Sequence, residues 1–533
     1  MTSQLHVRPW LACLTLGPRI VLFLILLSAF IQFVAFSLNQ VYILSYFGAQ
    51  PEDITFSIQL SYVGILAALP IIFRFVQYFE MKSIMVFVLM VGIGLCIAIL
   101  NTTNIILFFI IRFFQGAVVA SIAICIRLEI SGFLHKAETQ QVFGSAIFYT
   151  VLLCSNVLIG LAAANVEING SFIELYRYLI LYLVFILVLV LLSFKNKTGM
   201  RPFPLYQIDW IGACFFILGG VSLAYTFIYG SKYYWLTDYR IRTSTLLCIT
   251  GSLLFIWREL TVKRPGVHLS VLKYPRFLAG MILMALNYGM KESVNLIYGY
   301  TSNILQWTPV HVVYLGLASV AGIVISMILM AQLLVRKKIT IPGLFVLGFS
   351  MLLLYHLWVY FIFTPDLSYQ DLMLPVFFQG ASSGILFVPI MLMMLTSVPP
   401  STGIAGLIIA GDVRFVALLN VSAGFYNLQL KYNQLYKEGF LRHLTNTDEQ
   451  TTERLEGFRQ LYLSKGFSQD QAAALANSSL ARALSVQSQL LTNRAVFLYI
   501  AIMAAIILAI LLTIYFIGLY KKLSTPKVEI ATA

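Results

Sequence analysis

Residues 105–126 of the chain read IILFFIIRFFQGAVVASIAICI, a run of twenty-two residues with a single charge, Arg112. A helix of this length extends about 33 Å at ~1.5 Å per residue, enough to cross the ~30 Å hydrocarbon core of a bilayer. The stretch therefore predicts a membrane-spanning helix that carries one buried cation.

The same composition extends over the whole chain of 533 residues. Hydrophobic residues make up 60% and charged residues 11%, against about 45–50% and about 25% in soluble domains, and the mean hydropathy is +0.89. These values exclude a soluble enzyme, a disordered protein and a coiled coil. The long unbroken apolar runs also exclude an outer-membrane barrel, whose segments are short and alternating. We expect an all-α polytopic membrane protein.

Fourteen runs are long and apolar enough to be predicted as spans, and the eighth is the weakest of them. In chain order they are Pro18–Ser37, Ile54–Phe73, Ser83–Leu100, Ile105–Ile126, Val142–Ala163, Tyr176–Phe194, Trp210–Tyr229, Ile241–Trp257, Phe277–Leu305, Val310–Val335, Ile341–Phe363, Leu372–Leu395, Thr402–Leu428 and Val496–Tyr520.

The basic residues gather at one set of span ends. If the N-terminus is cytoplasmic, twenty of the 35 Lys and Arg residues lie at cytoplasmic ends and only four in short outer loops. Such a bias marks the cytoplasmic side and supports an even number of spans. It also explains the net charge of +14 without nucleic-acid binding. We expect a multi-pass protein of the inner cell membrane with both termini in the cytoplasm.

Two basic loops divide the spans into groups of six, two and six. The predicted domains are an N-terminal six-helix bundle at residues 1–195, a two-helix insert at residues 196–276 and a C-terminal six-helix bundle at residues 277–533. Paired bundles with a site between them near the midplane are typical of secondary transporters.

A hydrophilic segment, Lys431–Arg494, precedes the last span. Apolar residues at helical spacing predict one helix at Thr451–Lys465, and an alanine-rich stretch predicts another at Gln469–Leu491. On the predicted topology this hairpin lies outside the cytoplasm.

Charged residues inside spans are costly, so each of them is a functional hypothesis. Arg112 lies about 12 Å into the fourth span at ~1.5 Å per residue, with Gln115 on the same helix face. We interpret Arg112 as a fixed charge that stabilises a neighbouring carboxylate. The alternative is a structural donor to backbone carbonyls.

The ninth span carries a polar stripe. Asn287, Lys291 and Asn295 recur at every fourth residue, and Tyr288 and Glu292 form an adjacent pair. Such a stripe is expected to face a water-filled cavity rather than lipid. The alternative is that Lys291, in the outer half of the span, extends to the outer interface.

Further polar residues lie in the thirteenth and first spans. Asp412 and Arg414 are two residues apart near the middle of the thirteenth span, which puts them on different helix faces and prevents them from pairing with each other. A structural ion pair with another helix is the alternative for either. In the first span Gln32 and Asn39 follow a rough helical face, which fits either a pore lining or polar contacts between helices.

Three short motifs resemble a known family. Ile111–Gly116, IRFFQG, resembles the fourth-helix motif of the major facilitator superfamily. Ile208–Gly212, IDWIG, resembles the start of the seventh helix in the fourteen-span drug:proton antiporters, and Val398–Gly406, VPPSTGIAG, resembles the entry to their thirteenth helix. The long loop before the last span also fits that family, whose first-helix Asp has no counterpart here.

The resemblance implies a function for the buried charges. We expect proton-coupled export of a small, amphiphilic compound by alternating access, with Glu292 and then Asp412 as candidate proton carriers and Arg112 and Arg414 as the buried cations. The alternatives are an importer or facilitator of a specific metabolite, and a non-transporting receptor or scaffold. No phosphate-binding loop and no metal-ligand spacing occurs. No cofactor is therefore expected, the proton gradient is the expected energy source, and no enzyme is predicted.

The resemblance also implies a periplasmic adaptor protein as a partner, which the segment Lys431–Arg494 would contact.

Overall fold

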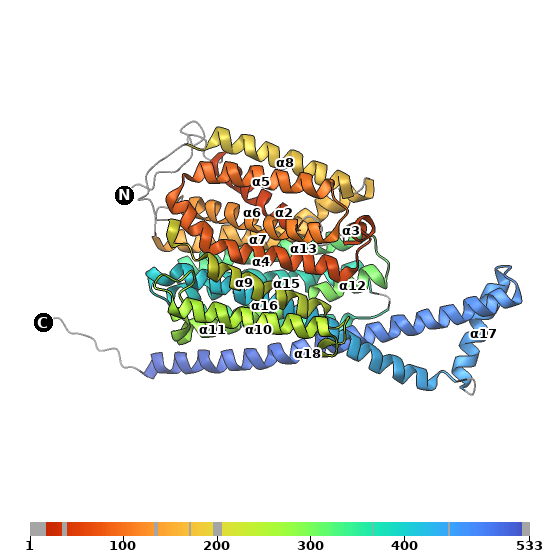
Figure 1. Ribbon diagram of the computed structural model, residues 1–533. Coiled ribbons are helices and arrows are strands. Elements are labelled where there is room, and N and C mark those ends of the chain that lie inside the picture. Colours follow the sequence, from red (N-terminus) through yellow and green to blue (C-terminus); the bar gives the residue numbers. More distant parts are fainter. Residues whose placement is uncertain are drawn as a thin grey trace.

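The computed structural model describes residues 17–34, 40–132, 137–169, 172–195, 205–365, 367–445 and 448–524. These ranges form a bundle of long helices that run side by side, with one helical projection at one end (Figure 1). Large apolar side chains cover the outside of the bundle; Phe87, Leu181 and Phe361, for example, are between 65% and 71% exposed. A surface of this kind suits lipid and not water, which confirms the predicted polytopic membrane protein.

The first half of the chain contributes six long helices and one short one. They are α2 (Gly17–Val34), α3 (Gln40–Phe47), α4 (Pro51–Tyr78), α5 (Met81–Leu100), α6 (Ile105–Gly132), α7 (Ala137–Asn169) and α8 (Phe172–Ser193). They pack mainly against one another.

The helices α9 (Trp210–Tyr229) and α10 (Tyr239–Thr261) follow and pack closely together, because Gly219 and Gly251 leave no room for a Cβ between them. Helix α9 also contacts α4 and the later helix α16, so it lies against both halves of the bundle. Three short 3₁₀ turns, η1 (Leu205–Gln207), η2 (Trp235–Thr237) and η3 (Leu269–Lys273), adjoin this pair.

The last part of the chain contributes eight helices. They are α11 (Pro275–Lys291), α12 (Val294–Asn303), α13 (Pro309–Val335), α14 (Ile341–Ile362), α15 (Tyr369–Thr396), α16 (Gly403–His443), preceded by the turn η4 (Pro400–Thr402), α17 (Glu449–Ser464) and α18 (Gln469–Ser524). The two halves meet where α4 contacts α16 and where α7 contacts α13 and α15.

The predicted count of fourteen spans is not confirmed. Twelve helices in the ranges that the structure describes are long and apolar enough to cross a membrane. Helix α10 falls outside that set despite its 23 residues, because polar and basic residues lower its hydropathy. The region of the predicted ninth span falls outside it because its helix is interrupted.

The prediction of one continuous helix at Phe277–Leu305 is wrong. Helix α11 ends at Lys291 and α12 begins at Val294, with Glu292 and Ser293 between them. Ser293 Oγ lies 2.9 Å from His356 Nε2 of α14, and Gln379 of α15 donates from Nε2 to the carbonyl oxygen of Lys291 at 2.9 Å. These contacts from other helices supply partners where the helical hydrogen bonds stop.

A repeated packing motif relates the two halves. The sequence FFQGA occurs at residues 113–117 of α6 and again at residues 377–381 of α15. In α6 a Cβ on Gly116 would lie 2.0 Å from the carbonyl oxygen of Ser61 in α4, and in α15 a Cβ on Gly380 would lie 2.1 Å from that of Ser319 in α13. Both helix pairs therefore approach to backbone contact through small residues, as membrane helices often do.

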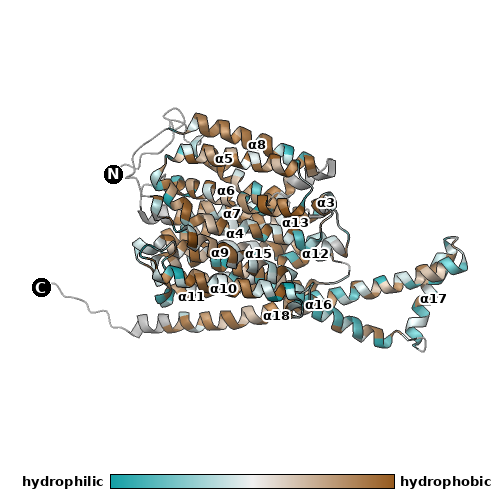
Figure 2. Ribbon diagram, in the orientation of Figure 1, coloured by the Kyte–Doolittle hydropathy of each residue, from teal (hydrophilic) through white to brown (hydrophobic). Residues whose placement is uncertain are grey.

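The hydrophilic projection is built differently from the prediction. Helix α17 matches the predicted helix at Thr451–Lys465 within two residues, but the predicted separate helices at Gln469–Leu491 and Val496–Tyr520 are one helix, α18, of 56 residues. Figure 2 shows that the bundle is mainly hydrophobic and that the projecting parts of α16, α17 and α18 are largely hydrophilic. The projection lies at the end of the bundle opposite to the end of α18 (Figure 1).

Candidate functional site

A partly open cavity, with about 980 Å³ of empty space that includes its open side, lies between the two halves. Seven helices line it, four from the first half and three from the second, and most of their side chains are aliphatic or aromatic. The lining residues are Phe30, Phe33, Tyr62, Ile65, Leu66, Leu69, Val119, Ala120, Ala123, Ile124, Arg127, Phe148, Tyr149, Leu152, Met284, Phe387, Met391, Leu407, Ala410, Gly411 and Arg414. A largely apolar cavity with a few polar groups is the usual form of a small-molecule site.

Each half contributes one arginine to this cavity. The guanidinium carbon of Arg127 lies 5.2 Å from the ring centroids of both Phe148 and Tyr149. That of Arg414 lies 4.8 Å from the ring centroid of Tyr288 and 6.0 Å from that of Tyr62. Aromatic faces attract cations, and the attraction is strongest where water is excluded. The rings therefore help to hold both guanidinium groups at the cavity.

Next to the cavity, the break between α11 and α12 carries an ion pair. Lys291 Nζ lies 2.8 Å from Glu292 Oε1, and Asn295 donates from Nδ2 to Glu292 Oε2 at 3.1 Å. Lys291 is the last residue of α11, where the helix dipole favours a cation, and Glu292 precedes α12, where the dipole favours an anion. The break thus stabilises both charges inside the bundle.

Tyr288 connects this ion pair to the cavity. Its ring lies 4.5 Å from Lys291 Nζ and 4.8 Å from the guanidinium carbon of Arg414, so two cations share one aromatic ring. Arg414 also interacts electrostatically with Glu292. A change of charge at Glu292 therefore changes the electrostatic energy of Arg414, which lines the cavity.

Arg112 does not line the cavity. It is fully buried within the first half, where it donates from Nη1 to the carbonyl oxygen of Gln32 at 2.8 Å and from Nη2 to that of Phe33 at 3.1 Å. Gln115 accepts from Arg112 Nη1 at 2.8 Å. This arrangement is the alternative that the sequence left open, a structural donor to backbone carbonyls near the end of α2.

The remaining predicted residues are dispersed. The side chain of Gln32 is buried in α2, and the amide of Asn287 is buried in α11 with neither polar atom hydrogen-bonded. Asn295 is exposed, and Asn39 lies outside the described residues. Asp412 is not among the cavity-lining residues; its Oδ1 is buried and has no hydrogen-bond partner.

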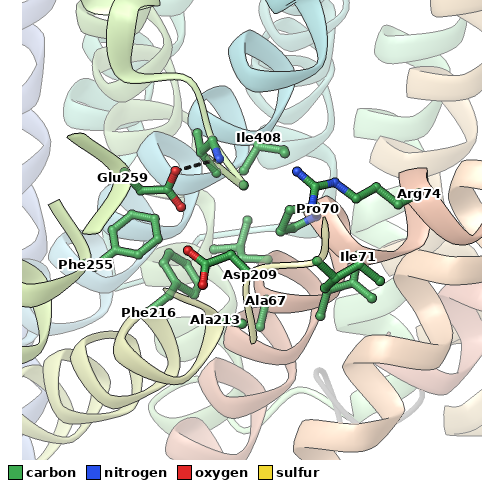
Figure 3. Close-up of a pocket in the computed structure, with 14 residues that line it drawn as sticks. Ala67, Pro70, Ile71, Arg74, Asp209, Ala213, Phe216, Phe255, Glu259 and Ile408 are labelled. Atoms are coloured by element: carbon green, nitrogen blue, oxygen red, sulfur yellow. Dashed lines mark hydrogen bonds between the residues drawn. The ribbon is translucent and has the colours of Figure 1, made fainter. Parts of the chain in front are cut away.

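A second, smaller cavity of about 440 Å³ lies beside the α9–α10 pair (Figure 3). At its edge Asp209 caps α9 by accepting from the Gly212 backbone N–H at 3.0 Å, and its carboxylate lies 3.2 Å from Arg258 Nε of α10. Glu259 accepts from the Val267 backbone N–H at 3.0 Å, the interaction drawn in Figure 3. The acidic side chains here have partners within the insert and its loop, which indicates a structural role in joining α9, α10 and the following loop.

Sequence reasoning missed Arg127 and the cavity tyrosines. Arg127 was counted among the basic residues at a cytoplasmic span end, where arginine is common for reasons of topology alone. Tyr62 and Tyr149 lie in long, mostly apolar spans, so their position in the sequence does not reveal which way they face. One signal for Arg127 does exist in the sequence. It follows Arg112 by fifteen residues on the same helix, so the two side chains are about 60° apart around the helix axis at 3.6 residues per turn.

Comparison with known proteins shows similarity to membrane transporters. No family model matches the chain. Over 204 residues the chain is 25% identical to the multidrug export protein EmrB from two strains of Escherichia coli, an alignment that covers 36% of this chain and only 38% of the relative.

Solved structures resemble the chain over most of its length. A POT family transporter in complex with 5-aminolevulinic acid superposes with a TM-score of 0.55 at 13% identity, covering 78% of this chain and 91% of the other. The xylose transporter XylE from E. coli, in a partially occluded inward open conformation, gives a TM-score of 0.47 at 14% identity over 76% and 89%. The chain has the fold of the major facilitator superfamily and resembles, over part of its sequence, a multidrug export protein.

Proposed function

We propose that this chain is a secondary transporter, not an enzyme or a scaffold, and that it moves a small amphiphilic compound through the central cavity by proton-coupled alternating access. The observation that carries this proposal is the cavity itself, because it lies between the two halves and receives one arginine from each. In transporters built from two repeated bundles, the site at the interface opens to alternate sides as the bundles rock. The proton gradient would supply the energy, with no cofactor.

Glu292 is the proposed proton carrier. While ionised, it balances Lys291 at 2.8 Å and acts on Arg414. A proton on Glu292 would remove the ion pair and leave two cations beside Tyr288. Uncompensated charge inside a protein costs several kcal/mol, so the two protonation states favour different arrangements of α11, α12 and α16. Asp412 remains the second candidate, since its carboxylate has a buried oxygen without a hydrogen-bond partner.

Export is the proposed direction, from a cytoplasmic side that carries both termini and the basic loops of an inner-membrane protein. The partial resemblance to a multidrug export protein supports it. Import is a second candidate, and one observation favours it: the described cavity lining holds cations and no carboxylate. A bound anion and a proton on Glu292 would stabilise each other, and by linkage each would raise the affinity of the other, which favours movement in the same direction.

Transport by purified protein in proteoliposomes with an imposed pH gradient tests the proposal. The cargo set is naphthalene-2-sulfonate, its neutral isostere naphthalene-2-sulfonamide and a naphthylmethyl trimethylammonium ion, with a trapped pH indicator. We expect uphill movement of at least one cargo with a proton flux whose sign distinguishes antiport from cotransport. In Glu292→Gln the gradient-driven movement should disappear while exchange of labelled for unlabelled cargo persists. Asp412→Asn is the matched variant; if it alone abolishes coupling, Asp412 is the carrier.

A periplasmic adaptor protein is the proposed partner of the projection formed by the outer parts of α16 and α18 and by α17. The support is the length of the projection, since residues 469–494 of α18, which precede the last predicted span, extend about 39 Å at ~1.5 Å per residue. Replacing residues 445–467 by a short linker should leave transport in proteoliposomes unchanged and abolish net export from cells. Full export by cells expressing this variant would rule out a partner at α17.

A further inference from the structure

The charges of the central cavity are all of one sign in the part of the chain that the structure describes. Arg127 and Arg414 are the charged residues of the lining, and its other polar side chains are the phenols of Tyr62 and Tyr149. Neither Glu292 nor Asp412 is part of the lining, and Glu292 is held by Lys291 and Asn295. The cavity therefore presents cations to whatever occupies it.

Arg414 has capacity to bind a ligand. Its Nε is buried and has no hydrogen-bond partner. A guanidinium carries five N–H donors in a planar fork that matches the oxygens of a carboxylate, sulfonate or phosphate. An unsatisfied donor inside a membrane protein is costly, and an oxyanion in the cavity would satisfy it.

Arg127 brings a second positive charge to the cavity from the other half. Arg127 lies on α6 and Arg414 on α16, and both line one cavity. The ring of Phe387 from the second half lies between tyrosines of both halves, 4.5 Å by centroids from that of Tyr149 and 5.7 Å from that of Tyr288. A ligand in this cavity would therefore meet two positively charged side chains and several aromatic rings.

We propose that the substrate is an amphiphilic organic anion, whose acid group binds the guanidinium of Arg414 while Arg127 adds to the positive charge of the cavity, and whose apolar body lies against the aromatic walls. The proposal rests on the proposed function in taking the cavity as the transport site, and it holds for export and import alike. A soluble aromatic acid and an anionic lipid share this chemistry.

Equilibrium binding without any gradient tests the proposal, so its outcome is independent of proton coupling. The protein in nanodiscs of zwitterionic lipid is titrated with naphthalene-2-sulfonate and with naphthalene-2-sulfonamide, which has the same shape and no charge, and ligand-induced thermal stabilisation is measured. We expect the sulfonate to bind about tenfold more tightly or better, since hydrogen bonds to charged groups are the stronger ones. The preference should be lost in Arg414→Gln and reduced in Arg127→Gln.

Two controls separate charge recognition from altered folding. Arg414→Lys keeps the charge and should retain a preference for the sulfonate. Arg336→Gln removes an exposed arginine at the end of α13 and should behave as the unchanged protein. Equal binding of sulfonate and sulfonamide, or a sulfonate preference that survives in Arg414→Gln and Arg127→Gln, would overturn the proposal.

A second arm identifies the source of the anion. In nanodiscs that contain phosphatidylglycerol, a lipid in the cavity would raise thermal stability in an Arg414-dependent manner and would weaken sulfonate binding by competition. This result would support an anionic ligand and identify it as a lipid. Sulfonate binding unaffected by phosphatidylglycerol assigns it to soluble acids.

Discussion

Arg112 is fully buried and Arg414 is partly buried within apolar stretches of α6 and α16, and their partners distinguish them. Arg112 donates to two backbone carbonyls of α2 and to Gln115. Arg414 lies on two tyrosine rings and lines the cavity. The first arginine holds helices together, and the second is positioned to meet a ligand.

Replacing each arginine by glutamine should therefore give different results. Arg112→Gln cannot reach both carbonyls, and leaving buried acceptors unsatisfied should lower the stability of the fold by about 2–4 kcal/mol. Arg414→Gln should change thermal stability little and should mainly weaken ligand binding. Melting temperatures in nanodiscs measure the difference. A stable Arg112→Gln protein that fails to bind ligand would instead give Arg112 a role at the cavity.

Residue types could be predicted from the sequence, but their orientation could not. The rule that ionisable groups within spans matter selected Arg112, Glu292 and Arg414. A helix that is apolar on all sides defines no face by its pattern, so the sequence could not separate Arg112, which faces α2, from Arg127, which faces the cavity. The partners that decide each role lie on other helices.

At the scale of helices, the closest contacts are made by glycines in equivalent places of the two halves. Gly116 of α6 and Gly380 of α15 each face a serine carbonyl of a neighbouring helix, at distances that leave no room for a methyl group. At Gly94 of α5, by contrast, an added methyl group would meet nothing within 4 Å. All three glycines lie inside apolar helices. Gly116 and Gly380 are tightly packed, whereas Gly94 has open space beside it.

Alanine at these positions should separate the two cases. Gly116→Ala and Gly380→Ala force neighbouring helices apart and should each cost about 1–3 kcal/mol, the usual range for overpacking. Gly94→Ala should be neutral or stabilising by up to about 1 kcal/mol, because alanine favours helix. Thermal unfolding in nanodiscs distinguishes them, and equal stability of Gly116→Ala and Gly94→Ala would show that α4 and α6 are not packed this closely.

Helix ends were harder to predict than helix positions. The break at Glu292 and Ser293 depends on His356 and Gln379, which are more than sixty residues away in sequence, so no local signal marked it. The predicted end of a helix near Leu491 followed the change from polar to apolar composition. In α18 the helical hydrogen bonds continue through that change, because polarity decides the environment of a helix and not its continuity.

At the scale of the whole molecule, the alternation of spans and loops could be predicted because membrane thickness fixes the length of each helix. The cavity could not, since it depends on how seven helices pack. The topology remains a prediction: the basic loops are cytoplasmic and the projection lies on the other side.

Labelling of single cysteines checks the topology. Ser468→Cys, exposed at the start of α18, should react with a membrane-impermeant maleimide in intact cells. Lys263→Cys, exposed after α10, should react only after the cells are opened. The unsubstituted protein provides the background from its own cysteines. The reverse pattern would invert the topology.

The central claim is that protonation of Glu292 decides to which side the cavity opens. Electron–electron distance measurements between pairs of spin labels test it without a known substrate. One pair, Ser83→Cys with Lys338→Cys, joins exposed sites of the two halves at the predicted cytoplasmic end, and Asn101→Cys with Gln370→Cys joins them at the other end. On acidification in nanodiscs, one pair should move apart while the other moves closer, and Glu292→Gln should hold the acidic distribution at every pH. Distances that ignore pH in both pairs, or a Glu292→Gln protein that responds as the unchanged one does, would contradict the account.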